Sequence, residues 1–172
     1  HAFIRDAIAS RWNRDFAYAV RIQYGGSMKP DNAAGLLNRN GLLAALEQLT
    51  GRGNEVALLH LEIDEFNLIN DSLGHAVGDA VLREVGARLQ AVVGAVDRVG
   101  RMGGSEFLAV LAQDEGSPTP DQAAARVLEA LAAPTEVLGT LHYLGINAGS
   151  ARFQEHGDTP ERLLRNAGLA TH

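Results

Sequence analysis

Three residues of this chain could together bind a phosphate-bearing ligand and a metal ion. Glu62 ends a strongly apolar, strand-like run, and Gly103-Gly104 joins two further extended runs as a tight hairpin turn. If the hairpin pairs beside the strand, its tip and Glu62 meet at one rim of the sheet. Glycines let backbone N–H groups approach a phosphate closely, and Mg²⁺ on a triphosphate favours one or two carboxylates. The alternative for Gly103-Gly104, taken alone, is a purely structural turn.

Composition limits the classes of protein to which the chain can belong. It has 172 residues, of which 46% are hydrophobic, and this suits one domain with an appendage and a substantial core. A net charge of −6 argues against binding nucleic acid through a basic surface. The absence of cysteine excludes disulfides, thiolate zinc sites and a cysteine nucleophile. Without a signal peptide or an apolar run of about 20 residues, we expect a cytoplasmic domain with no membrane insertion.

Strand-like and helical patterns alternate from Arg39 onward. Alternation over 56–63 predicts a strand with Glu62 off its most apolar face. Thr119 and Gln122 flank Pro120 in a capping-box pattern that predicts the start of a helix. An apolar stripe at helical spacing predicts a long helix over 77–93. The stripe consists of Val81, Leu82, Val85, Leu89 and Val92. Further helices are predicted over 41–49, over 65–73 and from 159, and extended runs over 96–102, 105–111 and 138–153. This alternation predicts an α+β or α/β fold with a mixed sheet.

Several spaced motifs resemble one known family. Residues 61–71 read Leu-Glu-Ile-Asp-Glu-Phe-Asn-Leu-Ile-Asn-Asp, Gly74-His75 and Gly78-Asp79 follow, and residues 103–107 read Gly-Gly-Ser-Glu-Phe. Over residues 35–172 this order resembles the GGDEF domain, the domain of diguanylate cyclases that condense two GTP into cyclic di-GMP. The resemblance implies an α+β fold (an α/β sandwich), with a mixed, mainly antiparallel central sheet flanked by helices as in nucleotide cyclases.

The resemblance also implies a role for each matching residue. Asn70 and Asp79 match the residues that hydrogen-bond guanine, whose edge offers both donors and acceptors. Capping of a loop or helix is the alternative role for both side chains. Phe66 and the residues just after the strand match the loop whose backbone lies near the phosphates, while Gly103 and Gly104 match the turn over the α-phosphate. GTP is therefore the implied ligand, and Mg²⁺ is the implied cofactor when nucleotide is bound.

Two departures from the family pattern affect its reaction. Glu62 stands where the family usually has a metal-binding Asp, so the carboxylate is retained on a longer side chain, although Mg²⁺ demands near-ideal octahedral geometry. Ser105 stands where the family has an acid that binds metal and supports activation of the attacking 3′-hydroxyl. A neutral hydroxyl is a weaker ligand, and its presence there lowers transition-state stabilisation. Glu106 keeps the next acid of the signature, but a neighbouring strand residue points to the other face.

The leading prediction is a degenerate GGDEF domain that acts as a GTP-binding or regulatory module in cyclic di-GMP signalling, with little or no cyclase activity. The first alternative is a weakly active diguanylate cyclase in which Glu62 and Glu106 hold the metal. Activity would require a homodimer, because each family site carries one GTP. The second alternative is a protein-interaction domain without a ligand. Family domains often adjoin a phosphodiesterase or sensor domain, so a longer protein carrying one of these is expected.

The first 38 residues differ from the rest and are predicted to be an N-terminal appendage with a helix and a short strand. Residues 39–172 then form the GGDEF-like domain, which we expect to be truncated at its C-terminus. Residues 1–34, with Gly25-Gly26-Ser27, resemble a C-terminal fragment of triosephosphate isomerase. That barrel needs about 250 residues, so isomerase activity is not expected. A fused fragment and a linker from a longer signalling protein are both compatible with this segment.

Overall fold

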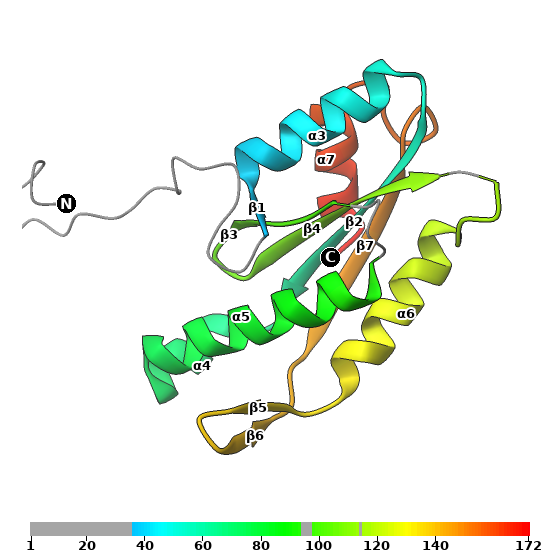
Figure 1. Ribbon diagram of the computed structural model, residues 1–172. Helices are drawn as coiled ribbons and strands as arrows, with labels where there is room; N and C mark the ends of the chain where they lie inside the picture. Colours follow the sequence, from blue (N-terminus) through cyan, green and yellow to red (C-terminus); the bar gives the residue numbers. More distant parts are fainter. Residues whose placement is uncertain (1–35, 94–97, 114) are drawn as a thin grey trace, which may run out of the picture.

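The fold is a five-stranded sheet between two helical layers, with a small separate hairpin (Figure 1). The structure is a computed structural model that describes residues 36–93, 98–113 and 115–172. The appendage predicted over 1–38 therefore lies almost entirely outside the described residues. The elements are β1 (Leu37–Asn38), α3 (Arg39–Gly51), β2 (Glu55–Ile63), α4 (Phe66–Leu73), α5 (His75–Val92), β3 (Arg98–Gly103), β4 (Glu106–Gln113), α6 (Pro120–Ala132), β5 (Thr135–Val137), β6 (Thr140–His142), β7 (Ile146–Arg152) and α7 (Pro160–Leu169).

The strand order of the main sheet is β1-β3-β4-β2-β7. β1 pairs with β3 in parallel, while β3, β4, β2 and β7 pair antiparallel along the sheet. The predicted mixed, mainly antiparallel sheet is thus confirmed. β5 and β6 form a separate antiparallel hairpin that lies beyond the end of α6 in Figure 1.

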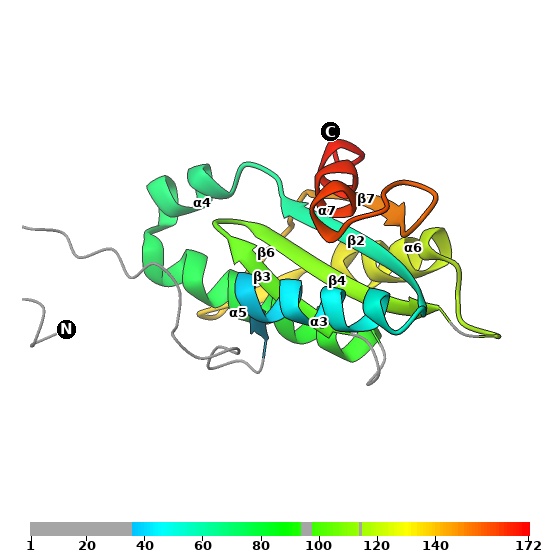
Figure 2. The same cartoon turned by 90° about the horizontal axis from the view of Figure 1, so that it is seen from above.

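β2 is the central strand, and both of its faces are buried. Ala57, Leu59 and Leu61 join the apolar cluster on the side of α5 and α6, whereas Val56 and Leu58 join the cluster on the side of α3 and α7. The alternation predicted from sequence is confirmed, since each face has its own helical layer (Figure 1). The chain leaves β2 and runs out to α4, which packs against the beginning of α5 (Figure 2).

The helices form where their apolar stripes and caps predicted them. The stripe of α5 is buried at Val81, Leu82, Val85 and Leu89, and its last turn packs against the same core. α6 begins with the predicted capping box, in which the Thr119 hydroxyl accepts from Gln122 N and the Gln122 side chain accepts from Thr119 N. No helix in the described ranges is long and apolar enough to cross a membrane.

Arg88 connects α5 to the end of α6. Its Nε donates to Glu84 Oε1 at 2.9 Å, and its other two nitrogens donate to the carbonyls of Ala133 and Pro134 at 2.8 and 2.9 Å. These carbonyls follow the last turn of α6, where helical backbone acceptors lack partners within the helix. One cation therefore fixes the relative position of two helices that cover the same face of the sheet.

We predict that Arg88→Ala lowers the free energy of unfolding by about 1–3 kcal/mol, because it removes hydrogen bonds from a charged donor. The measurement is urea unfolding followed by circular dichroism. Arg83→Ala, on an exposed position of the same helix, is the matched control and should change stability by less than about 0.5 kcal/mol. Equal effects of the two substitutions would contradict the role of Arg88.

His60 lies buried on β2 beneath the end of α7. Its Nδ1 lies 2.9 Å from Thr171 Oγ1, and the Thr171 hydroxyl in turn donates to Ala167 O at 3.0 Å. Nδ1 therefore carries the proton and donates to Thr171, so the neutral ring suffices to anchor α7 on the sheet. Burial lowers the pKa of His60, although Glu106 and Glu62 act in the opposite direction and His172 lowers it further.

A lowered pKa at His60 makes stability depend on pH. Below the ordinary value of 6.5 the unfolded chain takes up a proton that the folded chain resists, so the free energy of unfolding falls as the pH drops from neutral through that range. The contribution of His60 is fully present above pH 6.5. We expect His60→Gln, which keeps a donor, to flatten the profile between pH 7 and the folded-state pKa. Parallel profiles for the two proteins, measured by urea unfolding, would show that other groups cause the dependence.

Candidate functional site

The candidate site is built around the carboxyl end of β2. Ile63 N donates to Ser105 O at 3.2 Å, and Asp64 N donates to Gly145 O at 2.8 Å. The first bond ties the β3–β4 turn to the strand end, and the second ties the segment before β7 to the same point. The meeting of hairpin tip and strand end, expected from sequence, is therefore present in the structure.

The hairpin turn lies one residue later than the Gly-Gly motif predicted. β3 ends at Gly103 and β4 begins at Glu106, so the two turn residues are Gly104 and Ser105. The pairing shifts between Arg101 and Gly103, as in a β-bulge, and this extra residue moves the turn along the chain. Gly104 has a φ of 50°, the left-handed conformation that short hairpin turns require at their first position.

Arg101 holds this turn from within β3. Its Nε and Nη2 both donate to the Gly104 carbonyl, at 3.0 and 2.6 Å. Burial lowers the pKa of Arg101, and the nearby Asp79 carboxylate opposes that shift. The guanidinium remains charged and also lies within electrostatic reach of α5. The conformation of the turn thus depends on Arg101 rather than on the side chain of Ser105.

A pocket of about 230 Å³ opens at this point. It is lined by Glu62, Ile63, Asp64, Glu65, Phe66, Asn67, Ser105, Asn147 and His172. Three of the predicted residues, namely Glu62, Phe66 and Ser105, therefore share one cavity. Gly103, Gly104 and Glu106 are exposed beside the cavity and do not line it.

Two acidic residues stand opposite each other across β2 and β4. Glu62 pairs directly with Glu106, so their side chains leave the same face of the sheet. Glu62 is also approached by His172, whose Nε2 lies 3.6 Å from Glu62 Oε2. Like charges in directly opposed positions destabilise a sheet unless a cation lies between or beside them. The strand end is therefore a place where positive charge is favoured.

Asn70 lies near Phe66, against the turn of α5 that carries Asp79. The side chain of Asn70 lies over Gly78 on α5, where a Cβ would overlap Asn70 Oδ1 and approach Phe66 Cζ to 3.2 Å. Asp79 is the next residue of α5 and is exposed. Phe66 thus joins the pocket to the Asn70–Asp79 pair, although neither member of the pair lines the pocket.

The pocket offers carboxylate oxygens of the kind that bind a magnesium ion. Glu62, Asp64 and Glu65 all line the pocket, yet no three acidic or histidine residues within the described ranges are arranged to hold a metal by themselves. Mg²⁺ usually takes one or two protein carboxylates and completes its octahedron with phosphate oxygens and water. The residues therefore fit a metal that brings its own phosphate ligands, and Glu62 is the carboxylate that would hold it.

Comparison with known proteins identifies the family. Residues 28–172 match the family described as "Diguanylate cyclase, GGDEF domain". The chain belongs to the GGDEF domain family. Residues 1–46 also match triosephosphate isomerase, in agreement with the resemblance noted for the N-terminal segment.

Relatives of this GGDEF domain carry different activities. Cyclic di-GMP phosphodiesterase NbdA of Pseudomonas aeruginosa is 35% identical over 83% of the chain and 18% of its own length. Diguanylate cyclase TpbB of the same species is 33% identical over 76% of the chain and 30% of its own length. The chain thus spans less than a third of these curated relatives. A crystal structure of a sensory box/GGDEF family protein from Caulobacter crescentus superposes with a TM-score of 0.72 at 35% identity, covering 83% of the chain and 96% of that structure.

Sequence reasoning missed the part of the pocket lining that comes from distant elements. Asp64 and Glu65 directly follow β2 and fall in the segment that the family resemblance placed near the phosphates. Asn147 comes from β7 and His172 from the end of the chain, both more than 80 residues after Glu62. Their contribution depends on the pairing of β7 with β2 and on the packing of α7, which no local pattern reveals.

The contact between Asn70 and Gly78 predicts opposite effects for two helical Gly→Ala substitutions. Gly78→Ala should destabilise the domain by about 1–3 kcal/mol, because the added methyl displaces Asn70. Gly168→Ala, in α7 with open space around its Cβ, should stabilise it by about 0.5–1 kcal/mol. Urea unfolding measures both values. A stabilising effect of Gly78→Ala would mean that Asn70 is not held against α5.

Proposed function

We propose that this GGDEF domain binds GTP with Mg²⁺ and acts as a regulatory module of cyclic di-GMP signalling, with little or no cyclase activity. The observation that carries the proposal is the pocket at the end of β2, in which Glu62 keeps a carboxylate while the hairpin turn presents Ser105 instead of an acid. The family assignment supplies the ligand class. The proposal concerns this domain, since the activity of a longer protein would depend on its other parts.

The arrangement supports recognition of guanine. Asn70 is held against Gly78, and Asp79 is the next residue of α5 and is exposed, so an amide and a carboxylate are available near Phe66, which lines the pocket. Guanine offers an N1–H and an amino group as donors and O6 as an acceptor, which an amide and a carboxylate complement. We assign the base to this pair and the phosphates to the backbone between Glu62 and Phe66 and to the Gly104-Ser105 turn.

Low turnover is expected because the hairpin turn carries a serine where an acidic side chain would be needed. A bound Mg²⁺ would supply positive charge to the triphosphate. Glu62 would hold it, but the Ser105 hydroxyl carries no charge to bind metal or to support proton removal from the attacking 3′-hydroxyl. Arg101 and Ile63 hold the turn through its backbone carbonyls, so the loss of an acidic side chain leaves the binding surface in place. Binding and chemistry are thus separable at this position.

One observation favours a weakly active cyclase as the second candidate. Glu106 stands directly opposite Glu62 across β2 and β4, so a second carboxylate is available at the strand end. Condensation of two GTP would require two domains to face each other as a homodimer. Glu106 does not line the pocket, and for this reason the weakly active cyclase is the second candidate, after GTP binding with little or no turnover.

The relatives indicate the kind of partner expected. The family includes proteins named as phosphodiesterases and as cyclases, and the chain matches only a fraction of their length. We therefore propose that the domain works beside a phosphodiesterase or sensor domain and transmits the state of its GTP site to that neighbour. A cytoplasmic location accords with GTP as the ligand.

The proposal predicts that GTP with Mg²⁺ binds to the chain while cyclic di-GMP is formed weakly or not at all. Binding is measured by calorimetry and product by mass spectrometry. Ser105→Asp should raise product formation by about 10²-fold or more, since one electrostatic group in a catalytic site contributes about that factor. Glu62→Gln should weaken Mg²⁺-dependent GTP binding, because it removes the ligating charge.

Ser105→Asn is the control for Ser105→Asp, because it has the same size without the charge and should leave product formation at the starting level. Rapid cyclic di-GMP formation by the unsubstituted chain would contradict the proposal and would show that the domain is an active diguanylate cyclase. Absence of GTP binding in every variant would instead favour a protein-interaction domain.

A further inference from the structure

The small hairpin of β5 and β6 carries a concentration of exposed apolar side chains. Leu138, Leu141 and Tyr143 are 77%, 60% and 80% exposed, and all three fall within the short segment 138–143. The hairpin lies at the margin of the molecule, beyond the end of α6 (Figure 1). Single apolar residues scattered over a surface are ordinary, but several on one short hairpin form a patch that marks an interaction surface.

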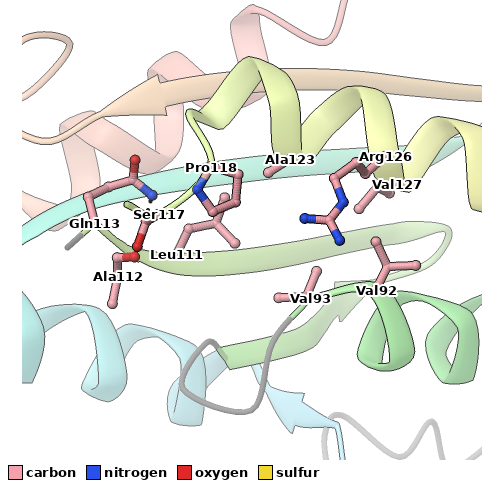
Figure 3. A pocket seen from close by; sticks show the side chains of 10 residues that line it. All are labelled: Val92, Val93, Leu111, Ala112, Gln113, Ser117, Pro118, Ala123, Arg126 and Val127. Atoms are coloured by element: carbon pink, nitrogen blue, oxygen red, sulfur yellow. Dashed lines mark hydrogen bonds between the residues drawn. The ribbon is translucent and has the colours of Figure 1, made fainter. Parts of the chain in front are cut away.

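This patch differs from the hollow that opens between α5 and α6. That hollow has a volume of about 270 Å³, and Val93, Leu111 and Val127 line it (Figure 3). All three are buried members of the core cluster, so the protein already covers most of their surface. The apolar side chains of the hairpin are exposed and line no such hollow. Small molecules bind in concave sites, so a second macromolecule is the occupant that suits the hairpin.

The turn of the hairpin holds a leucine in a conformation that leucine rarely adopts. Leu138 has a φ of 51° and Gly139 a φ of 79°, so both central residues of the turn have positive φ, as in a type I′ turn. Asn, Asp or Gly is favoured at the first of these positions, because other side chains are strained there. Backbone strain of this kind gathers at functional positions. The exposed and strained Leu138 therefore points to a role outside the folded domain.

β6 is the outer strand of this hairpin and has a free edge. Val137 on β5 is buried in the core, whereas Leu141 on β6 is exposed, and within the described ranges β6 pairs with β5 alone. Val137 and Thr140 are the directly paired residues next to the turn, so Leu141 directs its N–H and C=O away from β5. Residues 140–143 contain no proline or lysine to block this edge, which makes it a template for another strand.

We propose that β6 pairs antiparallel with β6 of a second copy of this chain, across a twofold axis at Leu141. In this register each Leu141 exchanges both of its free backbone hydrogen bonds with Leu141 of the second copy. Tyr143 then lies opposite Gly139 of the second copy, where the missing side chain leaves room for the ring. An aromatic residue beside an edge glycine stabilises a sheet in this way. The two hairpins become one four-stranded antiparallel sheet.

Charge favours a second copy as the partner. The chain carries a net charge of −6, so two copies repel each other over much of their surface. Residues 133–145 contain one acid, Glu136, one histidine, and no lysine or arginine. In the proposed register the two Glu136 side chains lie on the two β5 strands, three strand spacings or roughly 14 Å apart. This separation exceeds the Debye length of about 8 Å at physiological ionic strength, so the hairpins meet with little repulsion.

The small size of the patch makes the association weak. Three apolar side chains from each copy cover a few hundred Å², less than the roughly 800 Å² that each partner contributes to a stable interface. We therefore expect a dissociation constant on the order of 0.1 mM. None of the hairpin residues lines the pocket at the end of β2, so the inference does not rest on GTP binding.

The first test is sedimentation equilibrium of the full 172-residue chain without nucleotide, from about 0.01 to 1 mM. The average mass should rise from that of one chain toward that of two. Leu141→Lys places two like charges at the twofold axis and should weaken association at least about tenfold. Leu169→Lys makes the same change of charge on a leucine at the end of α7 that is 64% exposed, and it should leave association unaltered.

The second test uses the absence of cysteine from the chain, since a single introduced cysteine can form a disulfide only with its twin. Directly paired residues of antiparallel strands have Cα atoms about 5.5 Å apart, within the range that a disulfide spans. Leu141→Cys should therefore form a linked dimer under mild oxidation at least about tenfold faster than Leu169→Cys.

Three results would each overturn the proposal. Equal linking rates of Leu141→Cys and Leu169→Cys would place any contact between copies elsewhere, as would unchanged association of Leu141→Lys. A chain that stays monomeric at about 1 mM would exclude a second copy and leave the edge of β6 to a strand of another protein.

Discussion

The structure depends on the burial of β2 on all sides. This strand forms hydrogen bonds with β4 and with β7, and its two faces lie in separate apolar clusters beneath separate helical layers. A shift of its register by one residue would exchange the two sets of side chains between these clusters. The point at which the strand ends is therefore fixed by the core, and Glu62 is carried to the rim of the sheet by that constraint.

The same constraint positions the rest of the candidate site. At the end of β2, the N–H groups of Ile63 and Asp64 donate to the carbonyls of Ser105 and Gly145. The turn and the start of β7 are thus attached to β2 by backbone alone. Arg101 adds a second attachment to the turn from β3. A change of side chain at the turn alters the charge of the pocket while its shape is retained, which is the physical basis for proposing binding without turnover.

How much of this followed from sequence depended on whether the interaction was local. The alternation of β2, the stripe of α5 and the capping box at Thr119 were predicted because each is determined by neighbours in the chain. The hairpin turn was placed one residue too early, because two consecutive glycines allow either position and the bulge after Arg101 decides between them. The roles of Arg88, Asn147 and His172 could not be predicted, since each depends on contacts between distant elements.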